Sequence, residues 1–177
     1  MIESRFWKER LHRIAWQLRR VSKPPRWTER ACCTVEMDLM IGFFMVRRLI
    51  ELHKVSSRVR DFPMGIYSSP NAGINVNLVN RVDLDKLYKF ENEQMVVKKP
   101  LYVANQFIHA YISFVAKDET RNWGGVYIVS DFDRNDCIWR IPMQTIRELF
   151  LMASQEGPSS MTFTYNPQKR DYDVSVR

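Results

Sequence analysis

Apolar residues recur at helical spacing along the first twenty residues of the chain. The residues of this stripe lie three to five positions apart and are Phe6, Leu11, Ile14, Leu18 and Val21. This period predicts an amphipathic helix over residues 2–22. The sequence KPP at 23–25 ends it, because proline cannot continue the hydrogen-bond ladder. Thr28 is a residue type that caps helices, and it predicts a second helix running to about Ser56.

The second predicted helix is apolar on more than one side. One side carries Val35, Leu39, Gly42, Phe43, Val46, Leu49, Ile50 and His53 at helical spacing. Its middle is also apolar elsewhere, at Met37, Met40, Phe44 and Met45. This pattern predicts burial on two faces, in a core or in a dimer interface formed by residues 35–53. The short connection between the helices predicts that they form an antiparallel pair.

Breaker residues and short alternating runs follow the helices. The segment 61–73 predicts a connection with a short strand at 64–68, because it is rich in Pro, Gly and Ser. Residues 74–80 alternate apolar residues with Asn, which predicts a half-buried strand. Asp83 is placed to cap a helix over 84–90, and Pro100 is placed to open another. The sequence does not determine where that helix ends, since AYISFVA at 110–116 also fits a strand.

The last third of the chain predicts two hairpins separated by a helix. Strands at 125–131 and 137–141 flank the polar sequence FDRND, and Pro142 then opens a helix that Gly157 and Pro158 end. Its inward residues are Met143, Ile146, Leu149, Phe150 and Ala153. A second hairpin joins 161–165 to 171–176 around NPQKR.

This order of elements predicts an α+β fold. An N-terminal antiparallel helix pair is followed by a mostly antiparallel β-sheet with inserted helices. We expect one domain over residues 1–177, helical and basic over 1–57 and α+β over 58–177. The segment 57–73 is the one weak point for a domain boundary.

The charge is concentrated in the N-terminal third. The net charge is +7, and residues 1–60 hold 14 of the 27 Lys and Arg residues but only 6 of the 20 Asp and Glu residues. Such asymmetry favours contact with nucleic acid, anionic lipid or an acidic protein surface. It does not choose among them.

Cysteine usage and hydropathy predict a cytoplasmic protein. Cys32, Cys33 and Cys137 form neither a CxxC motif nor a disulfide framework, which indicates a reducing compartment. The N-terminus lacks the apolar core of a secretory signal. The longest apolar run, 39–46, is too short to span a bilayer.

The basic segment around the end of the first helix is the main candidate site. The candidate nucleic-acid-binding residues are Arg13, Arg19, Arg20, Lys23, Arg26, Arg30, Trp16 and Trp27. Clustered cations displace counterions from phosphates, and Trp or Arg can stack on exposed bases. The alternative is an ordinary solvated helix face whose aromatic residues belong to the core. A membrane-surface helix is disfavoured, because the second helix offers the same apolar stripe a partner.

The sequence gives weaker support for a metal site or a catalytic site. Asp131, Asp133 and Asn135 alternate as in a calcium loop, but Asp136 and Pro142 stand where that motif needs Gly and Glu. A tight polar turn explains the segment better. His109 with Asp131 or Asp133 leaves open a metal-dependent phosphodiesterase or nuclease. Nucleotide-binding and hydrolase motifs are absent from the sequence. We therefore expect a binding protein without catalytic residues, metal or cofactor, which docks on nucleic acid or an acidic protein, or forms a homodimer.

Overall fold

The computed structural model describes residues 3–24 and 26–176 and confirms the predicted α+β class. The helices are α1 (Ser4–Gln17), α2 (Glu29–Glu51), α3 (Ser57–Arg60), α4 (Leu84–Leu87), the 3-10 helix η1 (Phe90–Asn92), α5 (Pro100–Ile108) and α6 (Met143–Gln155). The strands are β1 (Met64–Pro70), β2 (Gln94–Lys98), β3 (Ala110–Lys117), β4 (Trp123–Ser130), β5 (Cys137–Pro142), β6 (Met161–Asn166) and β7 (Asp171–Val176).

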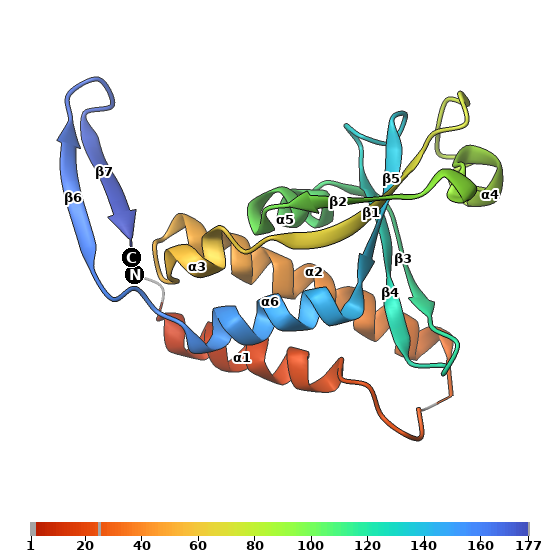
Figure 1. Cartoon of the computed structure of the whole chain (residues 1–177), viewed down its shortest axis with the longest axis horizontal. Coiled ribbons are helices and arrows are strands. Elements are labelled where there is room, and N and C mark those ends of the chain that lie inside the picture. The colour runs from red at the N-terminus through yellow and green to blue at the C-terminus, as the bar shows by residue number, and fades with distance from the viewer. Residues whose placement is uncertain (1–2, 25, 177) are drawn as a thin grey trace.

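The two N-terminal helices run in opposite directions, and both are shorter than predicted (Figure 1). Thr28 caps α2 as predicted, since its side chain accepts a hydrogen bond from Ala31 N. Helix α2 ends at Glu51 rather than near Ser56, because the chain turns at His53, whose φ is 54°. Helix α1 ends at Gln17 rather than at residue 22, because the following segment leaves the helix and bonds to a distant turn described below.

Five strands form an antiparallel sheet in the order β2-β1-β5-β4-β3. The predicted hairpin around FDRND is β4–β5, and the ambiguous segment at 110–116 belongs to strand β3. Strand β2 lies in a segment for which the sequence predicted no strand. The predicted helix at 84–90 stops at Leu87, because Tyr88 forms a bridge with Asn71.

The strand predicted at 74–80 is wrong. Asparagine side chains, rather than a neighbouring strand, bind the main-chain amides of this segment. Asn77 accepts from Val79 N at 2.9 Å, and Asn135 accepts from Val76 N at 2.8 Å. Val76 is buried, but Leu78 is 71% exposed, so the alternating pattern does not correspond to a buried strand face.

The main core lies between one face of the sheet and the helices. Phe43 of α2 stacks on Phe107 of α5 at a centroid distance of 4.0 Å and meets the edge of Phe150 of α6 at 5.1 Å. A Cβ atom at Gly42 would lie 2.4 Å from the Phe150 ring, so glycine is needed for this close approach of α2 and α6. The predicted inward residues of α6 are all buried.

A second, smaller core covers part of the opposite face of the sheet. It combines three sheet residues with three residues of the excursion between β1 and β2, namely Ile112, Val129, Ile138, Val76, Leu87 and Tyr88. The sheet therefore has apolar contacts on both faces. The larger set of buried apolar residues lies on the face that the helices cover (Figure 1).

The predicted C-terminal hairpin, β6–β7, forms a separate two-stranded sheet that projects from one end of the molecule (Figure 1). Among its described residues, Val176 is the buried one. It lies beside Ile50 and Val55, so the hairpin meets the rest of the chain near the end of α2.

Within the described ranges, no helix has both the length and the hydropathy that crossing a membrane would need.

Candidate polyanion-binding surface

The loop between α1 and α2 is fixed to the turn between β3 and β4 by one buried side chain. Asn122 is 7% exposed. Its Oδ1 accepts from Val21 N at 2.9 Å, and its Nδ2 donates to Val21 O at 3.1 Å. This two-way pairing copies the bonds of a β-ladder and gives the basic loop a defined position against the sheet.

Asp118 shapes the turn that presents Asn122. Its Oδ1 accepts from Thr120 N at 2.8 Å, from Thr120 Oγ1 at 2.7 Å and from Asn122 N at 3.0 Å. The hydrogen bond from the Thr120 side chain is the largest cause that lowers the pKa of Asp118 below its ordinary value. Arg121, at the tip of this turn, has a φ of 64°. A charged Asp118 therefore stabilises a strained turn directly beside the loop.

Trp27 packs onto the same turn and strand. Its ring lies 4.2 Å from that of Trp123, and its Nε1 donates to Arg121 O at 3.0 Å. Lys117 Nζ lies 5.3 Å from the Trp27 ring. One candidate stacking residue is thus engaged with the body of the protein, where it supports the loop rather than presenting an open ring face.

Trp16 and Arg19 form an exposed stack at the end of α1. The guanidinium carbon of Arg19 lies 3.3 Å from the ring centroid of Trp16, and Arg19 Nη1 donates to Trp16 O at 2.8 Å. Trp16 is 56% exposed. The pair places a fixed, planar cation next to an indole at the surface.

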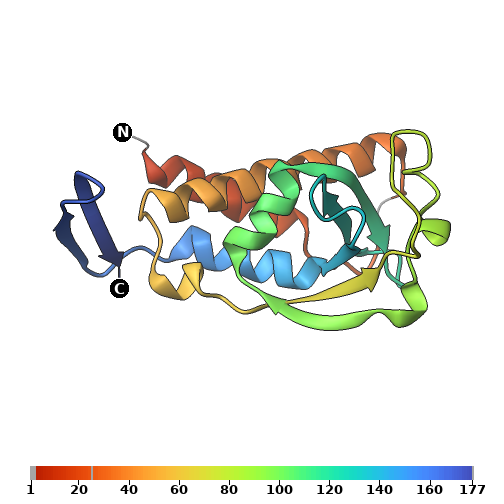
Figure 2. The same cartoon turned by 90° about the horizontal axis from the view of Figure 1, so that it is seen from above.

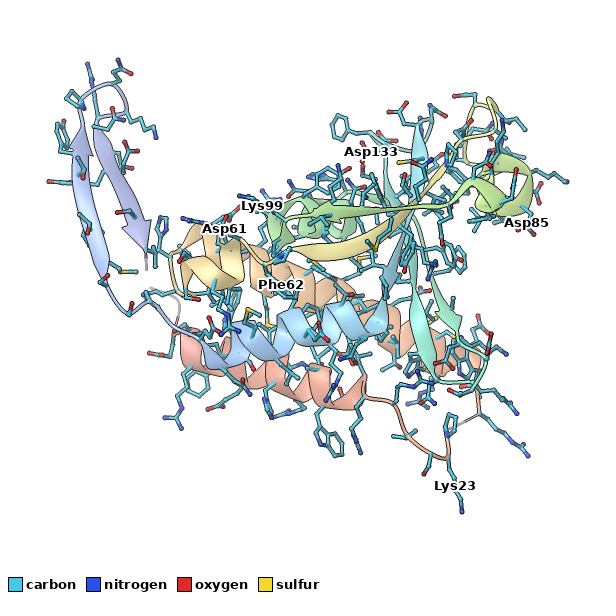
Figure 3. All side chains as sticks on the ribbon, in the orientation of Figure 1. Lys23, Asp61, Phe62, Asp85, Lys99 and Asp133 are labelled. Atoms are coloured by element: carbon cyan, nitrogen blue, oxygen red, sulfur yellow. The ribbon has the colours of Figure 1, made fainter. Side chains whose placement is uncertain are left out.

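The remaining candidate cations differ in how far they are neutralised. Arg20 forms an ion pair with Asp118 at 3.2 Å and donates to Thr120 Oγ1 at 2.9 Å. Within residues 3–24 and 26–176, no ion pair is formed by the exposed residues Arg13, Lys23, Arg26 and Arg30. Figure 3 shows Lys23 on the projecting loop.

Two cations that the sequence interpretation missed lie beside this loop. Lys117 and Arg121 are exposed on the β3–β4 hairpin, next to Trp27. The sequence around them, KDETRN, contains no local signal for the segment that it contacts. We call the set Arg13, Arg19, Arg20, Lys23, Arg26, Arg30, Lys117 and Arg121 the basic surface.

The groups considered for a nuclease do not gather into a metal site. Asp133 Oδ2 accepts from Tyr102 and Gln106, both at 2.8 Å, and from Trp139 at 3.3 Å. Asp131 pairs with Arg134, while His109 is exposed at the end of α5. Among the residues that the structure describes, no group of three or more His, Cys, Asp or Glu side chains could hold a metal ion. Figure 3 shows Asp133 on a different side of the molecule from Lys23.

Burial raises the pKa of Tyr102 well above its ordinary value, and its hydrogen bond to Asp133 adds to this effect. The Tyr102 hydroxyl is therefore a permanent donor to Asp133. This arrangement holds the β4–β5 turn against α5 and leaves Asp133 Oδ2 fully engaged.

The apolar middle of α2 is only partly buried. Met45 is 6% exposed and belongs to the main core, and Met40 is half-buried. Met37, Ile41 and Phe44 are 59%, 46% and 49% exposed. These three residues form an apolar stripe on the outer side of α2.

Comparisons with protein-family models, curated proteins and solved structures found no match to this chain.

Proposed function

We propose that this chain is a cytoplasmic binding protein that docks on nucleic acid through the basic surface. The observation that supports this proposal most is that the basic loop between α1 and α2 is joined to the β3–β4 turn, where Asn122 pairs with Val21 and Arg20 reaches Asp118. A loop whose backbone is held in this way loses less conformational entropy when it meets a polyanion than a free loop would.

The proposed mechanism is electrostatic. Several cations that approach together displace the counterions condensed on phosphates, so the logarithm of the binding constant falls linearly with the logarithm of salt concentration. The stack of Arg19 on Trp16 also offers a planar surface to an unpaired base. This arrangement favours binding to single strands with little sequence preference.

The test is fluorescence anisotropy of labelled single- and double-stranded DNA and RNA across a salt series. A variant with Lys23, Arg26 and Arg30 changed to Ala removes three exposed cations that make no ion pair in the described structure. Each phosphate contact contributes about −0.9 to the logarithmic salt slope on duplex DNA. The variant is therefore expected to bind more weakly and to flatten that slope by roughly 2–3.

The matched control changes Lys86, Lys89 and Lys169 to Ala, which removes the same charge elsewhere. Wild-type affinity in this control, with loss in the first variant, supports the basic surface. Equal losses in both variants would show that only net charge matters. No binding at low salt would contradict the proposal, because low ionic strength exaggerates surface electrostatics.

The exposed stripe of α2 favours a second candidate function, a protein-binding face that takes an apolar partner surface or a second copy. Met37, Ile41 and Phe44 are each close to or above half exposure. Ile41→Glu places a charge in this stripe without entering the core, so the fold is expected to persist. Loss of self-association or of a co-purifying protein in this variant, with nucleic-acid binding unchanged, would support the second function.

A further inference from the structure

Strand β2 is an open edge of the five-stranded sheet. It pairs with β1 on one side only, and Figure 2 shows it along the outer border of the molecule. The strand register and the alternation of hydrogen bonds decide which main-chain groups point outward. Val115 N of β3 points away from β4, because it donates to Glu36 Oε1. Main-chain N–H and C=O groups alternate in direction along each strand, so the registers of β3, β4, β5 and β1 extend this assignment across the sheet to β2. By this alternation, Met95 and Val97 direct their N–H and C=O groups away from β1.

The opposite edge of the sheet is protected, but the β2 edge is not. Helix α2 covers β3, and its Glu36 carboxylate binds the Val115 amide at 3.2 Å. Met95 and Val97 are 66% and 61% exposed. Neither Pro nor a register shift interrupts the pairing of β2 with β1. Natural edge strands normally carry such interruptions or outward-pointing charges, because an open edge is a template for another strand.

The two lysines at the end of β2 are held by other partners. Lys98 Nζ lies 4.5 Å from the ring of Tyr102 and 5.2 Å from that of Trp139, on the helical face of the sheet. Lys99 pairs with Asp61 at 2.8 Å, and Figure 3 labels the two residues next to each other. Their charges therefore do not shield the outward main-chain groups.

We propose that the β2 edge binds the β2 edge of a second copy of this chain, in antiparallel register about a two-fold axis at Val96. This register sets Met95 opposite Val97 of the second copy, so that their outward N–H and C=O groups form hydrogen bonds. The two sheets join into one of ten strands. Met95 and Val97 then cover each other across the new pair.

The charges at the two ends of β2 are opposite in sign, which favours a second copy of the chain as the binding partner. They also favour this register over others. With the axis at Val96, Lys98 lies opposite Gln94 and Lys99 lies opposite Glu93 of the second copy. Glu93 already binds Arg140 at 2.8 Å, so the added lysine extends an existing charge network. An axis at Val97 would instead bring the Lys98 residues of the two copies closer together, and it would set Lys99 opposite Met95.

The contact is small, so the dimer is expected to be weak. Pairing over about five residues covers less than the roughly 1,200 Å² of a stable interface, and this predicts a micromolar equilibrium. The β2 edge and α2 lie on opposite borders of the molecule in Figure 2, so this contact is separate from the apolar stripe of α2.

Two measurements test the proposal. Sedimentation velocity from about 5 to about 200 µM is expected to show a growing dimer fraction for the wild type. Val97→Pro is expected to stay monomeric with an unchanged fold, because it removes an N–H that points away from β1. A wild type that stays monomeric at the highest concentration would overturn the proposal. So would a dimer that survives Val97→Pro, above all one that Ile41→Glu abolishes.

Cross-linking tests the register. In a Cys33→Ser background, Val96→Cys places two thiols opposite each other across the axis, at a non-hydrogen-bonded position where Cβ atoms approach closely. Oxidation is expected to give a disulfide-linked dimer. Met95→Cys is the matched control, since it faces Val97 and is expected to cross-link far less. Equal cross-linking by both variants, or by neither, would overturn the proposed register.

Discussion

The carboxylate of Asp118 has opposing effects on the basic surface. Its Oδ1 accepts the hydrogen bonds that shape the β3–β4 turn, while its Oδ2 pairs with Arg20 and neutralises one cation. Asp118→Asn retains an acceptor oxygen for the turn but removes the negative charge. We expect this variant to bind single-stranded DNA about 2–5 times more tightly at low salt, since one more cation becomes available to phosphate.

The same substitution has a pH-dependent effect on stability. The pKa of Asp118 is lowered in the folded chain, chiefly by Thr120, so the charged carboxylate stabilises the fold above its unfolded-state pKa. The Asn variant should therefore have a lower Tm at neutral pH, and the difference should shrink as the pH falls through the carboxyl pKa values. A Tm deficit that grows in acid, or weaker DNA binding, would contradict this account of Asp118.

Glu36 is expected to change stability with pH in the opposite direction to Asp118. Burial against β3 raises the pKa of Glu36, and the hydrogen bond from Val115 N offsets this only in part. Deprotonation therefore destabilises the folded chain as the pH rises above the unfolded-state pKa. Glu36→Gln keeps the acceptor for Val115 without the charge, and thermal unfolding should show a Tm about 1–3 °C higher at neutral pH. The gain should vanish in acid. A loss at neutral pH would show that the charged form is needed.

At the scale of elements, the C-terminal hairpin has little support from the rest of the chain. Met161, Phe163 and Tyr165 alternate along one face of β6, and each is at least 37% exposed. Val176 alone of the described hairpin residues is buried. Glu156, just before the hairpin, is bound to the rest of the chain, because its carboxylate accepts hydrogen bonds from Ser56 and Arg58.

We therefore predict that a chain ending at Pro158 keeps its fold and its nucleic-acid affinity. Its Tm should change by no more than about 3 °C, since few buried contacts are lost. The control ends at Gln155, which also removes the Glu156 contacts and should lower the Tm further. Cooperative unfolding of the whole chain upon the shorter deletion would show that the hairpin supports the core.

Elements with strong local signals could be predicted from the sequence. Thr28 at the start of α2, Pro100 at the start of α5 and Pro142 before α6 are placed as expected. The wrong strand prediction at 74–80 has a physical cause. Asn residues that alternate with apolar residues match the pattern of a half-buried strand. Asn side chains can also bind nearby amides and replace strand pairing altogether, as Asn77 does.

At the scale of the whole molecule, only part of the candidate site could be predicted. The cations of residues 13–30 were visible as a local cluster. Their contact with the β3–β4 turn was not, because Val21 and Asn122 are 101 positions apart and neither carries a signal for the other. Lys117 and Arg121 were missed for the same reason. The partly buried position of Trp27 likewise depends on its contact with Trp123.

The central claim is that the basic surface, rather than net positive charge spread over the molecule, binds nucleic acid. The most direct measurement is to map amide chemical-shift changes by NMR during titration with a single-stranded DNA oligonucleotide. We expect the largest changes in residues 19–30 and 117–122, and we expect them to disappear at high salt. Changes centred on the β6–β7 hairpin or on the Lys98–Lys99 end of β2 would contradict it, as would no change at low salt.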